Sequence, residues 1–366
     1  MMKSLFNGVV FFLFIASSVA TASQKIVIAH RGASGYLPEH SLAAKAMAYA
    51  MGADYIEQDV VMSKDNHLLV LHDIFLDQVT NVRSIFPKRY RMLFGKKRWF
   101  AIDFTLAEIT KLSMTERFNF NPDTHIKKAV YPKRFPLNKS LFRVHTLEQE
   151  IELIQGLNKS TGKNVGIYVE IKSPWFHRHE GRDITLQTLL TLKKYGYKSK
   201  KDKVFLQCFD PDALLRIKNS LQPKLGIQLK LVQLIAETTW HETMRLVKGK
   251  LTAYAFDWMQ TPNGIKKIAT YADGIGPWKP MIVSNKSTHE HLLISDLVKN
   301  AHKNNLLVHP YTFRNDPGAI PSYARDFSDL LNIFLYTADV DGVFSDYPDL
   351  VESFIKTHSS QHKVKK

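Results

Sequence analysis

The sequence predicts an α/β fold, a TIM-type (β/α)8 barrel in which parallel strands form a ring that helices cover. Short runs rich in Val, Ile and Leu recur along the 366-residue chain, and helix-like stretches lie between them. Most of these runs are almost continuously apolar, which is typical of parallel strands that are buried on both faces. The alternative is an open, doubly wound sheet, but the sequence has no GxGxxG turn after a strand.

The expected strands are spread over the whole chain. They cover residues 25–30, 55–62, 68–72, 165–172, 203–209, 230–235, 254–258, 306–313 and 342–347. Between the first two, a helix is expected to begin at Pro38, because proline is tolerated in the first turn of a helix, and to end at Gly52. Strand and helix alternate in this way over a length that suits one large barrel.

One long segment interrupts this alternation. Residues 75–145 are rich in Phe, Tyr, Arg, Asn and Pro, and only residues 105–113 have a clear helical pattern. Loops of this length in a compact domain usually cover a site or bind a ligand. We therefore expect a single domain over residues 23–366, with an insertion at 75–145 over the C-terminal mouth of the barrel.

The first 22 residues have the features of a cleaved signal peptide. Lys3 precedes an apolar stretch that ends at Ile15, and small residues lie before the expected cleavage site after Ala22. The apolar stretch is shorter than the ~20 residues that a membrane span needs. The sequence thus predicts export to the periplasm, with secretion as the alternative, and no stable membrane insertion.

The chain is strongly basic, with 50 Lys and Arg residues against 34 Asp and Glu residues and a formal net charge of +16. Such an excess attracts anionic partners over long distances, but it does not select a fold. Nucleic-acid binding would need a basic groove with aromatic stacking platforms, and the sequence has no such motif. We therefore expect a small anionic substrate and no nucleic acid, and the sequence leaves the oligomeric state open.

Acidic residues recur at a spacing of two within the expected strands. Glu57 and Asp59 share one strand, and Glu170 and Lys172 share another. Residues two apart in a strand point to the same face, which inside a barrel is the lumen. Buried carboxylates are costly alone, but three of them can converge on a divalent cation. We expect Glu57, Asp59 and Glu170 to bind one such cation, with Ca²⁺ favoured and Mg²⁺ as the alternative, because all-oxygen ligands suit these ions better than zinc.

Two histidines lie where expected strands end. His30 ends the first strand and His72 ends a later one, and residues at the carboxyl ends of barrel strands meet at one mouth. An imidazole with a pKa near ~6.5 can take a proton from one reacting group or give a proton to another. Arg31 and Lys172 offer two cations for a phosphate group. Four other histidines are expected in loops or at the surface: His67, His177, His179 and His302.

Five short motifs, taken together and in this order, resemble the glycerophosphodiester phosphodiesterase family. They are HRGASGYLPEHSLAA (residues 30–44), EQDV (57–60), LHD (71–73), VEIK (169–172) and GVFSDYP (342–348). The sequence is most similar to the longer, exported bacterial branch of the family. This resemblance implies a barrel fold and metal-dependent cleavage of glycerophosphodiesters to sn-glycerol 3-phosphate and an alcohol.

The resemblance also implies roles for individual residues. His30 and His72 match the acid and the base of the family. The other matches are the metal ligands Glu57, Asp59 and Glu170 and the substrate contacts Arg31, Lys172 and Gln207. Two positions depart from the family pattern, because His40 replaces an Asn and Cys208 replaces a common Ser. Glu39 is expected beside the site, where it would stabilise the phosphate-binding turn.

Three other functions remain open at this point. A sphingomyelinase D-like phospholipase would share the two histidines and three carboxylates, but it needs an apolar entry for lipid tails, which the aromatic residues of 75–145 could supply. A non-enzymatic surface binding protein on the same barrel would be expected to lack a ligand or a histidine, and the sequence retains all of them. A glycoside hydrolase would need a pair of carboxylates, which leaves both histidines without a role.

Overall fold

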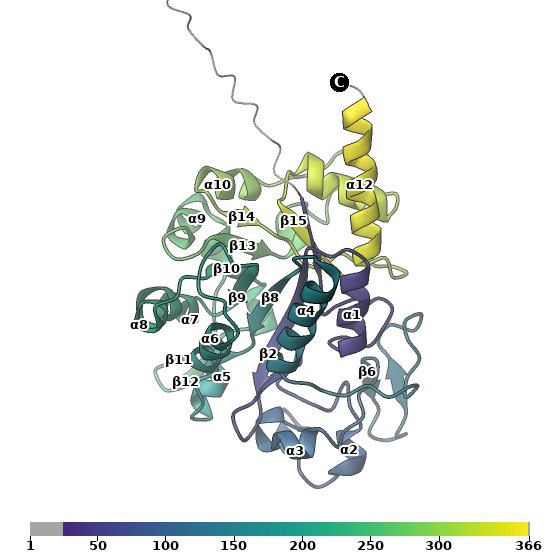
Figure 1. Ribbon diagram of the computed structural model, residues 1–366, viewed down its shortest axis with the longest axis vertical. Helices are drawn as coiled ribbons and strands as arrows, with labels where there is room; N and C mark the ends of the chain where they lie inside the picture. The colour runs from purple at the N-terminus through teal and green to yellow at the C-terminus, as the bar shows by residue number, and fades with distance from the viewer. Residues whose placement is uncertain (1–24, 365–366) are drawn as a thin grey trace, which may run out of the picture.

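Eight parallel strands form the centre of the molecule (Figure 1). The computed structural model describes residues 25–364, so the expected signal peptide lies outside the described residues. Neighbouring strands follow the order β14-β13-β10-β9-β8-β2-β1-β15, and a bridge between Phe313 and Ser345 brings the two ends of this sheet together. The strands are β1 (Ile26–Ala29), β2 (Tyr55–Met62), β8 (Gly166–Ile171), β9 (Val204–Cys208), β10 (Lys230–Ile235), β13 (Gly274–Pro277), β14 (Leu307–Val308) and β15 (Gly342–Ser345). This nearly closed parallel barrel confirms the predicted fold class.

Helices cover the outside of the barrel, and α1 and α4 lie side by side (Figure 1). The helices around the ring are α1 (Leu42–Ala50), α4 (Leu147–Thr161), α5 (Pro174–His179), α6 (Ile184–Lys194), α7 (Pro211–Arg216), α8 (Gln222–Leu225), α9 (Pro262–Ile268), α10 (Leu297–Lys303), α11 (Phe327–Asn332) and α12 (Pro348–Val364). The main apolar core joins strand residues such as Val27 and Ile56 to helix residues such as Ile151 and Ile154. Among the described residues, no helix combines the length and the apolar character that crossing a bilayer requires.

The interior of the barrel changes from apolar to polar along the strand direction. A buried cluster fills the first level: Ile28, Tyr55, Tyr168, Phe205, Val232 and Phe344. Residues two apart in a strand share a face. On five of these strands the next position on the same face is therefore polar: His30, Glu57, Glu170, Gln207 and Asp346. The apolar level closes the barrel below, so these polar side chains face the carboxyl ends of the strands.

The strand predicted at residues 254–258 is wrong, and the sequence did not predict the barrel strand at 274–277. Residues 254–258 do not form a strand, and Asp257–Gln260 form a 3₁₀ helix instead. The barrel strand is β13, whose sequence GIGP has few residues of high strand propensity. Glycine fits at 276 because a Cβ there would lie 2.5 Å from Cδ2 of Leu234. In addition, β3 (Leu68–Val70) pairs antiparallel with β2 and is not part of the parallel ring.

The predicted start of the first helix is also wrong. Helix α1 begins at Leu42, and the hydroxyl of Ser41 caps it by accepting a hydrogen bond from the N–H of Ala44 (3.1 Å). His40 has a φ of 60°, a left-handed conformation that cannot continue a right-handed helix. Pro38 instead opens a turn in which its carbonyl accepts a hydrogen bond from the N–H of Ser41 (3.1 Å).

Residues 75–145 form small elements outside the parallel sheet. These are α2 (Val82–Ile85), α3 (Leu106–Ile109), the hairpin of β4 (Arg91–Leu93) and β5 (Lys96–Arg98), and the hairpin of β6 (Phe118–Phe120) and β7 (Lys127–Ala129). They build a second apolar core that includes Phe104 and reaches Leu69 of β3. Phe100 stacks on Phe176 of α5, with ring centroids 5.5 Å apart. The segment therefore packs against the end of the barrel at which β2 and β3 pair.

Candidate active site

A cavity of about 520 Å³ lies at the carboxyl ends of the barrel strands. All eight predicted site residues line it: His30, Arg31, Glu57, Asp59, His72, Glu170, Lys172 and Gln207. They belong to β2, β8 and β9 or follow β1, β3 and β8. Trp240 and Trp278 form part of the remaining wall, and their rings meet edge to face with centroids 5.0 Å apart. The structure thus brings the predicted residues together, and their individual roles stay predictions.

The turn after β1 is built around Arg31 and Gly32. The two residues have φ values of 59° and 87°. A Cβ on Gly32 would lie 2.8 Å from the backbone of Ala44 in α1, so this position needs glycine. The N–H of Arg31 donates to Oε2 of Glu57 (2.6 Å), and its Nη1 donates to Oε2 of Glu39 (3.1 Å). The turn therefore fixes the guanidinium of Arg31 among carboxylates at the edge of the cavity.

The register of three neighbouring strands sets one polar row of the cavity. Asp59 of β2 lies opposite Glu170 of β8, and Glu170 lies opposite Gln207 of β9. Nζ of Lys172 is 2.7 Å from Oε1 of Glu170. Burial raises the pKa of Glu170 well above its ordinary value, because the opposing effect of Lys172 does not cancel burial and the repulsion from Asp59. A positive charge beside this row would favour the ionised form of Glu170.

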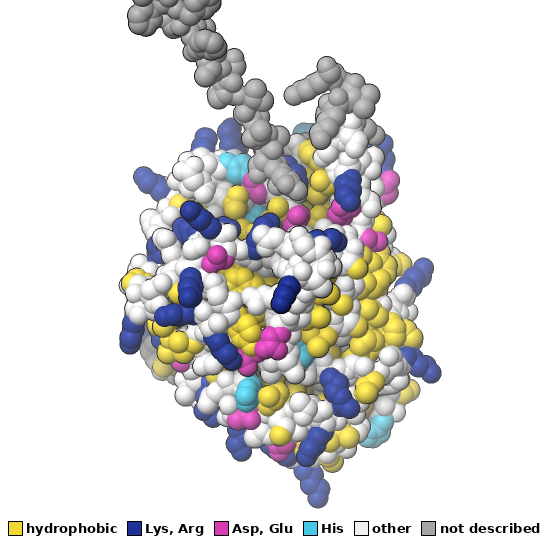
Figure 2. Space-filling view, viewed as in Figure 1, with side chains coloured by type: hydrophobic (Ala, Val, Ile, Leu, Met, Phe, Trp, Pro, Cys, Tyr) yellow, Lys and Arg dark blue, Asp and Glu magenta, His cyan; other side chains and the backbone are white. Residues whose placement is uncertain are grey.

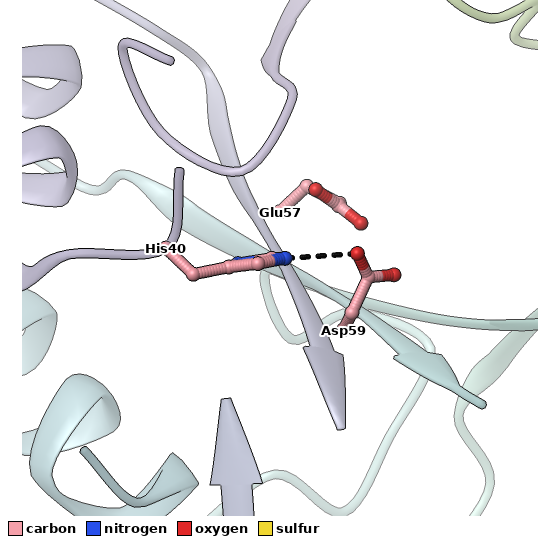
Figure 3. A group of neighbouring side chains, drawn as sticks. All are labelled: His40, Glu57 and Asp59. Atoms are coloured by element: carbon pink, nitrogen blue, oxygen red, sulfur yellow. Dashed lines mark hydrogen bonds and ion pairs between the residues drawn. The ribbon is translucent and has the colours of Figure 1, made fainter. Parts of the chain in front are cut away.

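Asp59 of this row and two side chains next to it have the spacing of a metal site. His40, Glu57 and Asp59 each offer one ligand atom, and these atoms all lie within 4.8 Å of one another. Figure 3 shows Glu57 and Asp59 projecting from β2 and His40 approaching them, with its Nε2 2.8 Å from Oδ2 of Asp59. The second oxygen of Asp59, Oδ1, is buried and has no hydrogen-bond partner. An unpaired buried carboxylate oxygen is costly unless a cation faces it, so the donor set fits a divalent cation.

The pKa values of His40, Glu57 and Asp59 are consistent with a divalent cation bound among them. Burial raises the pKa of Glu57 well above its ordinary value, and the neighbouring Asp59 adds to the rise. Burial acts in the same direction on Asp59, but His40 and Lys172 hold its pKa well below the ordinary value. Burial lowers the pKa of His40 to about 3, so its imidazole is neutral at neutral pH, the form that binds metals. Glu170, the third predicted ligand, lies outside the group of three.

His30 and His72 each have one ring nitrogen bonded to a carboxylate. Nδ1 of His30 is 2.6 Å from Oδ1 of Asp346, and Nδ1 of His72 is 2.7 Å from Oδ1 of Asp73. The carboxylates favour the Nδ1–H tautomer, which leaves Nε2 of each ring to accept or donate the transferred proton. Burial and the charge of Arg31 lower the pKa of His30 to about 4, and the same two causes lower the pKa of His72. Both rings are therefore neutral at neutral pH in the free protein.

Several residues near the site could not be found from the sequence. Arg117 donates hydrogen bonds to Glu39 and Asp73, and Arg134 donates one to Asp346. Both arginines belong to residues 75–145, where no strand end or motif marks them. The sequence marks His40 only as a departure from the family pattern next to Glu39, and this departure is the one signal that could have pointed to its contact with Asp59.

The prediction for His177 is wrong, since this residue is buried rather than in a surface loop. Its Nε2 accepts a hydrogen bond from the N–H of Met62 (3.1 Å), and its Nδ1 donates to the carbonyl of Ser173 (3.0 Å). The sequence around it is polar and contains Pro174, which favours a loop. Because backbone groups satisfy both ring nitrogens, the imidazole can nevertheless be buried between α5 and β2.

A parallel barrel with histidines and carboxylates around a cavity at the carboxyl ends of its strands is the architecture of a barrel enzyme. Residues 30–350 match the model of the Glycerophosphoryl diester phosphodiesterase family. The chain is 50% identical over 336 residues to the glycerophosphodiester phosphodiesterase of Haemophilus influenzae, which covers 91% of this chain and 90% of the relative. It is 42% identical over 354 residues to that of Treponema pallidum, which covers 96% of each chain. The chain belongs to the glycerophosphoryl diester phosphodiesterase family, and it is a phosphoric diester hydrolase.

Solved structures show the same fold at low sequence identity. A phosphodiesterase from Oleispira antarctica, in complex with the product sn-glycerol-3-phosphate, superposes with a TM-score of 0.57 at 18% identity and covers 90% of this chain and 96% of its own. A glycerophosphodiester phosphodiesterase from Agrobacterium tumefaciens gives a TM-score of 0.55 at 19% identity and covers 90% and 99%. At these identities the likeness supports the barrel fold alone.

Proposed function

We propose that the protein hydrolyses glycerophosphodiesters, such as glycerophosphocholine or glycerophosphoethanolamine, to sn-glycerol 3-phosphate and an alcohol, and that the reaction depends on a divalent cation. The observation that carries this proposal is the cavity, because acidic side chains, basic side chains that include Arg31 and Lys172, and two carboxylate-bound histidines line the same volume. The names of the relatives from Haemophilus influenzae and Treponema pallidum, and the product bound in the Oleispira antarctica structure, support the choice of substrate.

The phosphate of the substrate binds to Arg31 and Lys172. Both side chains line the cavity. Arg31 offers a planar fork for two phosphate oxygens, whereas Lys172 offers a point charge. Burial alone would lower the pKa of Lys172, but Glu170 and Glu242 raise it above the ordinary value, so Lys172 is protonated at neutral pH. The basic surface, where Lys and Arg side chains project around the visible face in Figure 2, would speed the approach of an anionic diester.

The glycerol part of the substrate supplies the nucleophile. Its 2-hydroxyl attacks phosphorus and the bond from phosphorus to the head-group oxygen breaks, which gives a cyclic glycerol phosphate. One histidine takes the proton of the 2-hydroxyl at Nε2. The other is protonated at Nε2 in the complex, because the anionic diester offsets the charge of Arg31 that lowers both histidine pKa values, and it gives this proton to the departing alkoxide. Water then opens the cyclic phosphate with the roles of His30 and His72 reversed, so that both rings regain their starting protonation.

The metal-binding residues in this proposal are Glu57, Asp59 and Glu170, with His40 as a further nitrogen donor in contact with Asp59. A bound divalent cation would lower the cost of negative charge on the phosphate and on the attacking oxygen. Carboxylate ligands favour Ca²⁺ or Mg²⁺, and Ca²⁺ is our first choice. An imidazole ligand suits transition metals better, so the preferred metal also reports whether His40 binds it.

The direct test is to incubate the purified protein with glycerophosphocholine and to measure release of sn-glycerol 3-phosphate, with and without a chelator. We expect release that the chelator abolishes and that Ca²⁺ restores. Absence of release over a series of metals would contradict the proposal. Sphingomyelin and a nitrophenyl glycoside, tested beside it, represent the phospholipase and the glycoside hydrolase, and faster turnover of either would favour that alternative.

We also propose that the protein belongs to the exported branch of the family and acts in the periplasm, with secretion as the alternative. The support is the pattern of residues 1–22, with a basic residue, a short apolar stretch and small residues before Ser23. Fractionation of expressing cells followed by N-terminal sequencing tests this. We expect a periplasmic protein that begins at Ser23, and a cytosolic protein that retains the first 22 residues would contradict it.

A further inference from the structure

We propose that Arg117 and Arg134 are positioning residues for the two histidines, each acting through the carboxylate that is bonded to one ring. Both arginines lie in residues 75–145, outside the parallel sheet. The inference rests on the acid and base roles proposed above for His30 and His72. The inference gives residues 75–145 a role in catalysis, which is to position the two histidines.

The first of these chains of contacts begins at His30. Oδ1 of Asp346 lies 2.6 Å from Nδ1 of His30, and Oδ2 of Asp346 accepts hydrogen bonds from Nη2 of Arg134 (2.6 Å) and Nε of Arg314 (2.8 Å). Asp316 accepts hydrogen bonds from Nε (2.8 Å) and Nη2 (2.6 Å) of Arg134. The side chains of Arg134 and Asp346 are only 4% and 1% exposed, so this contact is shielded from water and salt.

The second chain of contacts has the same order of residue types. Oδ1 of Asp73 lies 2.7 Å from Nδ1 of His72, and Oδ2 of Asp73 accepts a hydrogen bond from Nη1 of Arg117 (2.6 Å). Glu39 accepts hydrogen bonds from Nε (3.0 Å) and Nη2 (2.6 Å) of Arg117. Each chain therefore runs from histidine to aspartate, arginine and a further carboxylate.

Both oxygens of each aspartate are occupied in this arrangement. One oxygen faces the ring nitrogen and the other faces the guanidinium, so rotation of the carboxylate would break a charged hydrogen bond at each end. Burial alone would raise the pKa of Asp346 and of Asp73, but the neighbouring arginines and histidines hold both values well below the ordinary one. The aspartates are thus ionised and fixed, and this favours one tautomer and one orientation of each imidazole.

A purely structural role is the competing explanation, in which the arginines only attach residues 75–145 to the barrel. That role would affect stability but not the tautomers of His30 and His72, and it would not lower kcat selectively. The chain offers a control in Arg216, which makes a two-pronged ion pair with Asp183 (2.8 and 2.6 Å) on the outer helices and is more exposed than Arg134. Arg216 does not line the cavity.

The experiment compares Arg134→Gln, Arg117→Gln and Arg216→Gln with the natural protein in the glycerophosphocholine assay. We expect each of the first two changes to lower kcat by about 10- to 100-fold, the usual effect of removing a residue that orients a functional group, with KM changed by less than about threefold. Arg134→Lys and Arg117→Lys should recover part of the loss. In protein labelled with ¹⁵N-histidine, the ring nitrogen shifts of His30 or His72 should lose the signature of a fixed Nδ1–H tautomer.

A kcat within about twofold of the natural value together with unchanged ring shifts would overturn the inference, as would an equal loss in Arg216→Gln. If Arg134→Gln does not fold, Asp316→Asn loosens Arg134 from its far side and is expected to move the same two readouts in the same direction. His30→Ala and His72→Ala distinguish the proposed roles of the histidines from the proposed roles of the arginines. Full activity in these variants would refute the proposed acid and base roles, whereas loss in them without loss in the arginine variants would refute only the present inference.

Discussion

The barrel strands and the segment 75–145 differ in how they relate to the cavity, because strand residues line it and no residue of 75–145 is among its lining residues. The strands supply residues whose place follows from sequence spacing, since Glu57 and Asp59 are two apart and His30 directly follows β1. The segment supplies Arg117 and Arg134, which reach the residues around the site through ion pairs and, for Arg134, a hydrogen bond to the carbonyl of Ser34, all distant in the sequence. The groups that line the cavity therefore lie on or next to the strands, whereas the segment contacts residues that are bonded to these groups.

The largest effect should follow removal of the metal or its ligands. Asp59→Asn and Glu57→Gln each remove a charge from a buried carboxylate, so we expect kcat to fall by ~10³-fold or more, and a chelator should abolish activity. Activity of the chelated enzyme should return with Ca²⁺ or Mg²⁺ more than with Zn²⁺, as measured by release of sn-glycerol 3-phosphate. Full turnover in a preparation verified by elemental analysis to be free of metal would contradict the proposed dependence on a divalent cation.

A slightly smaller loss is expected at the two histidines. His30→Ala and His72→Ala should each lower kcat by at least ~10²-fold, the usual scale of general acid–base catalysis, while circular dichroism and metal binding stay unchanged. A nitrophenyl leaving group needs no proton, so it should rescue only the variant that lacks the acid. The exposed His179 provides the control, and His179→Ala should retain full activity. Small, equal losses at His30 and His72 would remove both from the mechanism.

Changes in strand β5 of the β4–β5 hairpin should have a modest effect. Lys96 and Lys97 are exposed, and no shielding protects their charges from salt. The double change to Gln should lower kcat/KM by less than about tenfold through KM, and should flatten its dependence on ionic strength. The measurement is kcat and KM over a range of salt concentrations. A collapse of kcat at constant KM in a folded variant would show that the hairpin contributes to the chemistry.

The least effect on turnover is expected at His177, which supports the sheet rather than the reaction. His177→Ala leaves the N–H of Met62 without its acceptor, so the free energy of unfolding should fall by about 1–3 kcal/mol while kcat stays within about twofold. Burial lowers the pKa of His177 to about 4. Its contribution to stability is therefore present above pH ~6.5 and is lost as the pH falls toward 4, because only the unfolded chain takes up the proton in that window. Urea unfolding of the natural protein and of His177→Ala at pH 8 and pH 5 measures this contribution. A larger difference in unfolding free energy between the two proteins at pH 5 than at pH 8 would contradict the expected sign.

The sequence predicted the barrel and the residues of the cavity because both depend on short-range patterns. Buried strands are apolar runs, and Glu57 and Glu170 interrupt two such runs at positions that face the lumen. It did not predict β13, because two of its four residues are glycines, which have low strand propensity, and Gly276 packs closely against Leu234 instead. Nor could it predict the contact of Arg134 with Asp346, because an ion pair across 212 positions leaves no local pattern.

The central claim is that the substrate's own hydroxyl attacks phosphorus between the two histidines. It is tested most directly by comparing, with ³¹P NMR, the hydrolysis of glycerophosphocholine and of the analogue in which hydrogen replaces the 2-hydroxyl. An attack within one molecule gains orders of magnitude over attack by water, so we predict that the analogue reacts at least ~10³-fold more slowly, and that a cyclic phosphate forms only from the natural substrate. Equal rates for the two diesters would contradict the claim and would assign the attack to water.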